Sequence, residues 1–168
     1  MSDTKVFRIW IKAPADKIWT AITDPEWTAK YAYAAPQFYE LKKGGRFYST
    51  ATEEMKAYAA AGGFELPETI IDGEVLEAEP PRRLVQTWRM LMDPSTAVEP
   101  FTTLTYEIED SGPGVCRVTI THELTGAPAH SAMVSGSPDA GAEGGGGWAW
   151  VLSDLKSLLE TGKVMAGS

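Results

Sequence analysis

The segment near the C-terminus constrains the fold of this sequence more than any other part. In GWAWVLSDLKSLLE, residues 147–160, apolar side chains recur at intervals of three and four residues, which is typical of a helix with one continuous apolar face. That face carries Trp148, Val151, Leu152, Leu155, Leu158 and Leu159, and the opposite face carries Asp154, Lys156, Ser157 and Glu160. Gly162 is suited to the left-handed conformation at a helix C-terminus, so we expect the helix to end there. An apolar face this long must be buried, so the rest of the chain has to supply the surface that covers it.

Strands upstream of this helix supply that surface. Several short segments alternate between apolar and polar residues, which predicts strands with one buried face. The predicted strands are Val6–Lys12, Arg46–Thr50, Thr69–Ala78, Leu84–Met92, Thr102–Glu109 and Val115–Leu124. The last four are joined by short turns, so we expect them to pair antiparallel.

Three shorter helices are predicted between the strands. Pro14 begins the first, which runs to Ile22, and Pro25 begins the second, which carries Trp27 and Tyr31 on one side. The third lies in a segment inserted at about residues 52–67, where a capping threonine and good helix formers precede two glycines. The chain therefore combines helices with an antiparallel sheet, which is the α+β class.

Composition and charge exclude several classes of protein. A length of 168 residues fits one domain, residues 1–168, that can bury a core without disulfides. Cys116 is the only cysteine, so an intrachain disulfide is excluded. A net charge of -8 without a dense cluster of lysine and arginine argues against a nucleic-acid partner. Because Met1–Trp10 lacks a signal-peptide pattern and no apolar run approaches membrane-spanning length, we expect a cytoplasmic protein without membrane contact.

The segment before the last helix is rich in Gly, Ala, Ser and Pro and ends in four glycines, Gly144–Gly147. A phosphate-binding loop would continue with Lys-Ser or Lys-Thr, and here Trp148 follows instead. We interpret residues 127–147 as a flexible loop that acts as a hinge or lid.

His122 is the candidate acid or base of the sequence. It shares a strand face with Cys116, Val118, Ile120 and Leu124, so we expect it to be buried. A buried histidine that is hydrogen-bonded to a neighbour is the interpretation we favour over a catalytic one. His130 lies in the predicted loop without a second histidine or cysteine at ligand spacing, so neither a metal nor another cofactor is predicted.

A cavity between the sheet and the last helix would be lined by the inward faces of both. Aromatic side chains with polar tips suit both cores and ligand sites, and methionine adapts to irregular ligands. The candidate ligand-binding residues are Tyr31, Gln86, Trp88, Met90, Tyr106, Ile120, His122, Trp148 and Leu152. No set of catalytic residues is predicted.

Five segments of the sequence carry a resemblance to a known family. They are residues 11–31 (IKAPADKIWTAITDPEWTAKY), 44–47, 73–77, 80–88 (PPRRLVQTW) and the final helix. In this order the chain resembles the SRPBCC superfamily, and within it the family related to the C-terminal domain of the activator of the heat-shock ninety-kilodalton ATPase. The resemblance implies a helix-grip fold, in which about six or seven antiparallel strands wrap around the long last helix and two short helices close one end. Residues 52–67 depart from the family pattern, because a short hairpin turn is expected in their place.

Three functions are compatible with the sequence. Binding of a small hydrophobic or aromatic molecule requires only the cavity, and we rank it first. An enzyme of the cyclase or hydratase type would use His122 as acid or base. Chaperone contact, which the family resemblance suggests, ranks last because the chain lacks the extra N-terminal domain of the eukaryotic activator. The protein is expected to be a monomer or a homodimer.

Overall fold

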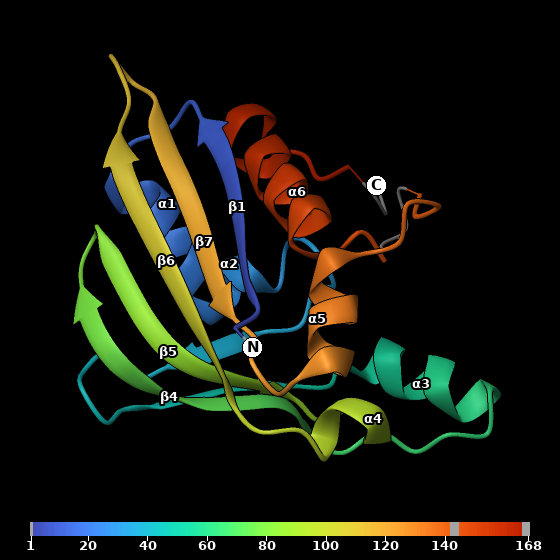
Figure 1. Cartoon of the computed structure of the whole chain (residues 1–168). Helices are drawn as coiled ribbons and strands as arrows, with labels where there is room; N and C mark the ends of the chain where they lie inside the picture. Colours follow the sequence, from blue (N-terminus) through green and yellow to red (C-terminus); the bar gives the residue numbers. More distant parts are fainter. Residues whose placement is uncertain (1, 142–144, 166–168) are drawn as a thin grey trace.

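The computed structural model describes residues 2–141 and 145–165, and these form seven strands and six helices (Figure 1). The strands are β1 (Thr4–Ile11), β2 (Gln37–Tyr39), β3 (Arg46–Thr50), β4 (Thr69–Glu79), β5 (Arg83–Met90), β6 (Thr102–Asp110) and β7 (Cys116–Glu123). The helices are α1 (Ala15–Thr23), α2 (Pro25–Thr28), α3 (Glu53–Ala61), α4 (Pro94–Ala97), α5 (Pro128–Ser135) and α6 (Gly147–Thr161). None of the helices in these ranges is long and apolar enough to cross a membrane.

All seven strands belong to one antiparallel sheet in the order β1-β7-β6-β5-β4-β3-β2. The six predicted strands lie within two residues of the observed bounds, because each has an inward apolar face that local alternation reveals. Helix α6 lies beside β1 (Figure 1). The predicted α+β helix-grip fold is confirmed.

Helix α6 buries more of its surface than the apolar stripe predicts. Leu152 and Leu155 are buried as expected, and Gly162 ends the helix with a left-handed φ of 79°. Asp154, which was assigned to the exposed face, is only 1% exposed. Its carboxylate accepts hydrogen bonds from the backbone amides of Ala32, at 2.7 Å, and Met165, at 2.6 Å. The prediction was wrong because the turn after α2 and the residues that follow α6 cover this side of the helix.

Three short elements were not predicted. Strand β2 has three residues and α4 has four, too few for a periodic pattern. Helix α5 lies inside residues 127–147, so this part of the predicted loop is regular structure, with His130 and Val134 buried. Residues 142–144 of that prediction lie outside the described residues. Helix α2 ends at Thr28, so Tyr31 lies in the turn that follows it rather than on the helix.

The glycines between α5 and α6 allow two backbones to touch. A Cβ at Gly136 would lie 2.3 Å from the carbonyl carbon of Gly146, and a Cβ at Gly147 would lie 2.1 Å from the Val134 oxygen. Gly147 also has a φ of 65°, in the region that favours glycine. These glycines therefore join the end of α5 to the start of α6.

The inserted segment forms helix α3 as predicted. Thr52 caps it by accepting a hydrogen bond from the Met55 amide at 3.1 Å. The helix has no fully buried residue, and Tyr58 is 86% exposed. Figure 1 shows α3 at the outer edge of the molecule, beyond α5. The insertion therefore adds little to the hydrophobic core.

Candidate functional site

A cavity of about 450 Å³ lies between the sheet and α6. Seven of the nine candidate ligand-binding residues are in its wall, namely Tyr31, Trp88, Met90, Tyr106, Ile120, Trp148 and Leu152. Gln86 and His122 are fully buried outside the wall. The structure thus brings most of these side chains around one space, and their role in binding stays a prediction.

The sheet part of the wall follows from strand register. Gln37 on β2 is opposite Ser49 on β3, Ser49 is opposite Ile71 on β4, and Ile71 is opposite Met90 on β5. Side chains of directly opposed residues lie on the same face of a sheet. All four therefore line the cavity side by side.

The cavity has two kinds of wall, which we name the sheet wall and the helical wall. The sheet wall includes Trp88, Tyr106 and Ile120 of β5, β6 and β7. The helical wall is the part of the lining that comes from α3, α5 and the segments next to α3 and β5, namely Met55, Leu66, Met92, Met133 and Val134, and α6 adds Trp148 and Leu152 between the two walls. With Met90, four of the six methionines of the chain line the cavity, and their flexible thioethers adapt to irregular shapes.

Sequence reasoning missed most of the helical wall. Met55 and Leu66 come from the insertion, and Met133 and Val134 come from α5. Residues 127–147 were predicted to be a flexible hinge or lid and residues 52–67 an insertion with a helix, and both segments reach the cavity. The mobility of residues 127–147 stays a prediction. Pro128 at the first position of α5 was the one local signal for a helix there.

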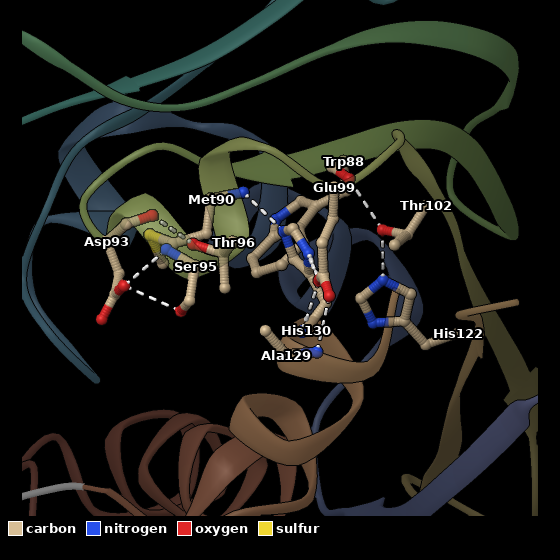
Figure 2. Close-up of polar contacts among 10 residues, drawn as sticks. All are labelled: Trp88, Met90, Asp93, Ser95, Thr96, Glu99, Thr102, His122, Ala129 and His130. Carbon is tan, nitrogen blue, oxygen red and sulfur yellow. Dashed lines mark hydrogen bonds and ion pairs between the residues drawn. The ribbon is translucent and has the colours of Figure 1, made fainter. Parts of the chain in front are cut away.

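His122 lies behind the sheet wall, in a network of neutral groups. Its Nδ1 accepts a hydrogen bond from the indole N–H of Trp148 at 3.0 Å, so the proton is on Nε2, which is 2.7 Å from the hydroxyl oxygen of Thr102. Thr102 in turn donates to the carbonyl of Trp88 at 2.7 Å (Figure 2). Burial lowers the pKa of His122 to about 3, and the neighbouring His130 adds to this shift. His122 is a neutral, fully hydrogen-bonded residue, which does not favour an acid or base role.

His130 lies in a second network, which includes a carboxylate. Its Nε2 accepts a hydrogen bond from the Met90 amide at 3.0 Å, and its Nδ1 donates to Glu99 at 2.7 Å. Glu99 also accepts from the amides of Ala129, at 2.7 Å, and His130, at 2.9 Å (Figure 2). These amides belong to the first turn of α5, which has no cap from its own N-cap residue. We name this arrangement the Glu99 cap.

Electrostatics agree with a charged Glu99. Burial alone would favour the neutral acid, but the hydrogen bonds from Ala129 and His130 outweigh it and lower the pKa of Glu99 below its ordinary value. The carboxylate therefore ties α5 to the segment that precedes β6.

Trp88 connects the two networks. Its ring is edge-on to both imidazoles, at 5.3 Å from His122 and 5.7 Å from His130 between centroids, and it lies 5.9 Å from the ring of Trp148. Such contacts stabilise aromatic clusters beyond their burial. One indole of the cavity wall is thus held from behind by both histidines.

A tyrosine cluster includes two of the tyrosines of the wall, Tyr31 and Tyr106. The hydroxyl of Tyr31 donates to the Ala21 carbonyl at 2.9 Å, and that of Tyr39 donates to Gln86 at 2.9 Å. Burial raises the pKa of Tyr31 and of Tyr106 above the ordinary value, so both phenols are neutral.

The chemistry of the described residues does not indicate a metal site. In residues 2–141 and 145–165, no group of three or more histidine, cysteine or acidic side chains is arranged to hold a metal ion. Asp93 is the acidic residue of the cavity wall, and its carboxylate accepts hydrogen bonds from Ser95, which lower its pKa. The site is thus mainly an apolar cavity.

Comparison with known families decides the relationship. The profile of the family described as "Activator of Hsp90 ATPase homolog 1-like protein" matches residues 12–160. The chain belongs to this family. No curated protein matches the sequence significantly.

Solved structures with the same fold come from bacteria and a parasite. Protein MLL2253 from Mesorhizobium loti aligns with a TM-score of 0.63 at 20% identity, over 94% of this chain and 97% of its own. CalU16 from Micromonospora echinospora aligns with a TM-score of 0.51 at 21% identity. The alignment covers 73% of this chain and 60% of CalU16. PFC0360w, an HSP90 activator from Plasmodium falciparum, aligns with a TM-score of 0.51 at 19% identity, over 71% of each chain. At these identities the likeness shows the fold alone.

Proposed function

We propose that this member of the family binds a small apolar or aromatic molecule in the cavity between the sheet and α6. The observation that carries the proposal is the volume of about 450 Å³ enclosed by aromatic and methionine side chains. Ligand sites in proteins have volumes of roughly 300–1,000 Å³ and mostly apolar walls with a few polar groups.

Catalysis by His122 is not favoured by the geometry. Both ring nitrogens are engaged, by Trp148 and Thr102, and the side chain lies outside the cavity wall. A general acid or base has to reach the proton it transfers, directly or through one water. The cyclase or hydratase alternative therefore needs another acid or base. The acidic residue of the cavity wall is Asp93, and its carboxylate already accepts two hydrogen bonds from Ser95.

Tryptophan fluorescence tests the proposal, because Trp88 and Trp148 line the cavity. A panel of lipids, polyketides and flavonoids should contain compounds that quench the emission and raise the melting temperature, since a ligand at 100 times its Kd stabilises by about 2.7 kcal/mol. Trp10→Phe removes a half-exposed indole outside the wall and should leave the quenching unchanged. Ala35→Phe adds a ring at a small residue of the wall and should abolish binding. A panel without any response contradicts the proposal.

Contact with a heat-shock ATPase is a second proposal, supported by the family. PFC0360w is described as an HSP90 activator, and the family profile carries the same activity in its description. Purified chaperone should then hydrolyse ATP faster when this protein is added. An unchanged rate, together with no complex in analytical ultracentrifugation, contradicts this alternative. The cytoplasmic location and the oligomeric state stay predictions.

A further inference from the structure

Tyr106 places a hydroxyl group in the mainly apolar wall of the cavity. The residue is 7% exposed and lies in the cavity wall, on the inward face of β6. Its ring meets the Trp148 ring edge-on, with 6.3 Å between centroids and 82° between planes. A molecule in the cavity would therefore contact this phenol.

The Tyr106 hydroxyl has no hydrogen-bond partner in the described part of the chain, unlike the other buried hydroxyls of the wall. Tyr31, Ser49 and Thr28 each donate to a backbone carbonyl, at 2.9, 2.8 and 3.3 Å. The hydroxyl is also not enclosed by protein. Among the described residues, the side-chain atoms that are sealed off without a partner are Gln86 Nε2 and Trp150 Nε1. The Tyr106 hydroxyl is therefore open to the cavity.

Trp88 supplies a second donor of the same kind. It is 5% exposed and lies in the wall, and its indole N–H has no partner within the described ranges and is not sealed off. The rings of Trp88 and Tyr106 both contact the ring of Trp148, at 5.9 and 6.3 Å between centroids. An indole N–H can only donate, so it pairs with an acceptor.

We propose that the molecule in this cavity carries a carbonyl oxygen that accepts a hydrogen bond from the hydroxyl of Tyr106, an inference that rests on the proposed function. A ligand without a polar atom displaces water from this hydroxyl and leaves it unpaired, which weakens binding. A carbonyl replaces that water. A carbonyl oxygen, which only accepts, also suits the indole N–H of Trp88, which only donates. Tyr106 thus selects among apolar molecules of similar shape.

The experiment compares two probes of one shape, 2-acetylnaphthalene and 2-isopropenylnaphthalene, in which a C=O group replaces a C=CH₂ group. Isothermal titration calorimetry gives the Kd of each for the wild type, for Tyr106→Phe and for Tyr48→Phe. Tyr48 is the matched control, because its ring stacks on Phe38 at 4.9 Å and lies outside the cavity wall. Comparing the ratio of the two Kd values between proteins cancels the difference in hydration between the probes.

Tyr106→Phe should weaken binding of the ketone about tenfold and leave binding of the alkene unchanged, because only the ketone loses a hydrogen bond. Tyr48→Phe should leave both Kd values unchanged. The melting temperature of Tyr106→Phe without probe should not fall, since the hydroxyl has no hydrogen-bond partner to lose among residues 2–141 and 145–165.

Three results would overturn the inference. The first is that both probes bind with the same Kd ratio in the wild type and in Tyr106→Phe. In that case the Tyr106 hydroxyl does not hydrogen-bond the carbonyl of the ligand, and the cavity proposal still stands. A clear loss of stability in Tyr106→Phe without probe would show that the hydroxyl has a structural role. If neither probe binds the wild type, both this inference and the proposed function are contradicted.

Discussion

The sheet wall and the helical wall of the cavity are stabilised in different ways. Behind the sheet wall, His122 is held by neutral partners, the indole of Trp148 and the hydroxyl of Thr102. The helical wall depends on His130 and on the carboxylate of Glu99, which caps α5. Both histidines are fully buried, and each donates from a different ring nitrogen. His122 therefore stabilises a hydrogen-bonded network in the core, whereas His130 helps to attach α5 to the segment that precedes β6.

Because of this difference, a single substitution should destabilise the two walls to different degrees. The sheet wall is covered by strand pairing on both sides, so the loss of one hydrogen bond changes it little. Helix α5 has few other anchors, because only His130 and Val134 are fully buried in it. A single substitution at Glu99 should therefore affect the helical wall more than any substitution at His122 affects the sheet wall.

The largest effect is expected for Glu99→Ala. It leaves the Nδ1–H of His130 and two amides of α5 without their acceptor, and hydrogen bonds to charged groups contribute roughly 1.5–3 kcal/mol each. These three bonds share one carboxylate and are not additive, so we expect the free energy of unfolding, from urea denaturation, to fall by about 3 kcal/mol, the upper value for one such bond. Glu109→Ala is the control, because its pair with Arg117 is exposed and contributes about 0.5 kcal/mol. Equal losses in the two variants would remove the distinction between the walls.

A slightly smaller loss is expected for Gly147→Ala. The added Cβ meets the Val134 oxygen, and a left-handed φ costs a non-glycine residue about 1–2 kcal/mol, so we expect a total loss of about 2–3 kcal/mol. Gly44→Ala has a similar φ of 81° with nothing within 4 Å, so it should lose only about 1 kcal/mol. Amide exchange in α5 should become faster in Gly147→Ala alone. If the two variants lose equal stability, the contact between α5 and α6 is not tight.

As the pH is lowered, the contribution of His122 to stability should be lost before that of Glu99. An unfolded histidine has a pKa near 6.5, whereas the pKa of His122 in the fold is about 3. Between these values the unfolded state binds one more proton, so stability falls as the pH decreases, by about 2 kcal/mol from pH 6.5 to 4.5. The pKa of Glu99 is lowered, so its contribution is lost only at more acidic pH. Denaturation curves of His122→Gln should lack this part of the pH dependence, and a slope equal to that of the wild type would show that His122 is not kept neutral.

The smallest effect is expected for ligand binding by His122→Gln at neutral pH. Glutamine keeps a donor and an acceptor next to Thr102 and Trp148, so the fold should persist. The affinity for a ligand found with the fluorescence panel should change by about 1 kcal/mol, the usual net contribution of one hydrogen bond. A ligand that is chemically converted by the wild type, at a rate reduced by roughly 10² to 10⁴ in the variant, would restore the catalytic alternative.

The sheet wall could be predicted from sequence and the helical wall could not, for a physical reason. Alternation places Trp88 and Tyr106 on inward faces, because side chains in a strand point in turn to opposite sides. Met55 and Met133 reach the cavity from α3 and α5, and nothing in their local pattern shows where those helices pack. Asp154 illustrates the same limit, since a carboxylate on a polar face became buried through partners far away in the sequence.

The insertion contributes little to the stability of the fold, but its side chains reach the cavity. Thr50 and Thr69 are paired across β3 and β4, so residues 51–68 leave the sheet and return to it at one place. Loops of this kind change in length at little thermodynamic cost, and α3 contributes no fully buried residue. The segment nevertheless brings Met55 and Leu66 to the cavity. The sequence of this segment can therefore change during evolution while the sheet and α6 keep their structure. Such changes would alter the shape of the ligand that the cavity accepts.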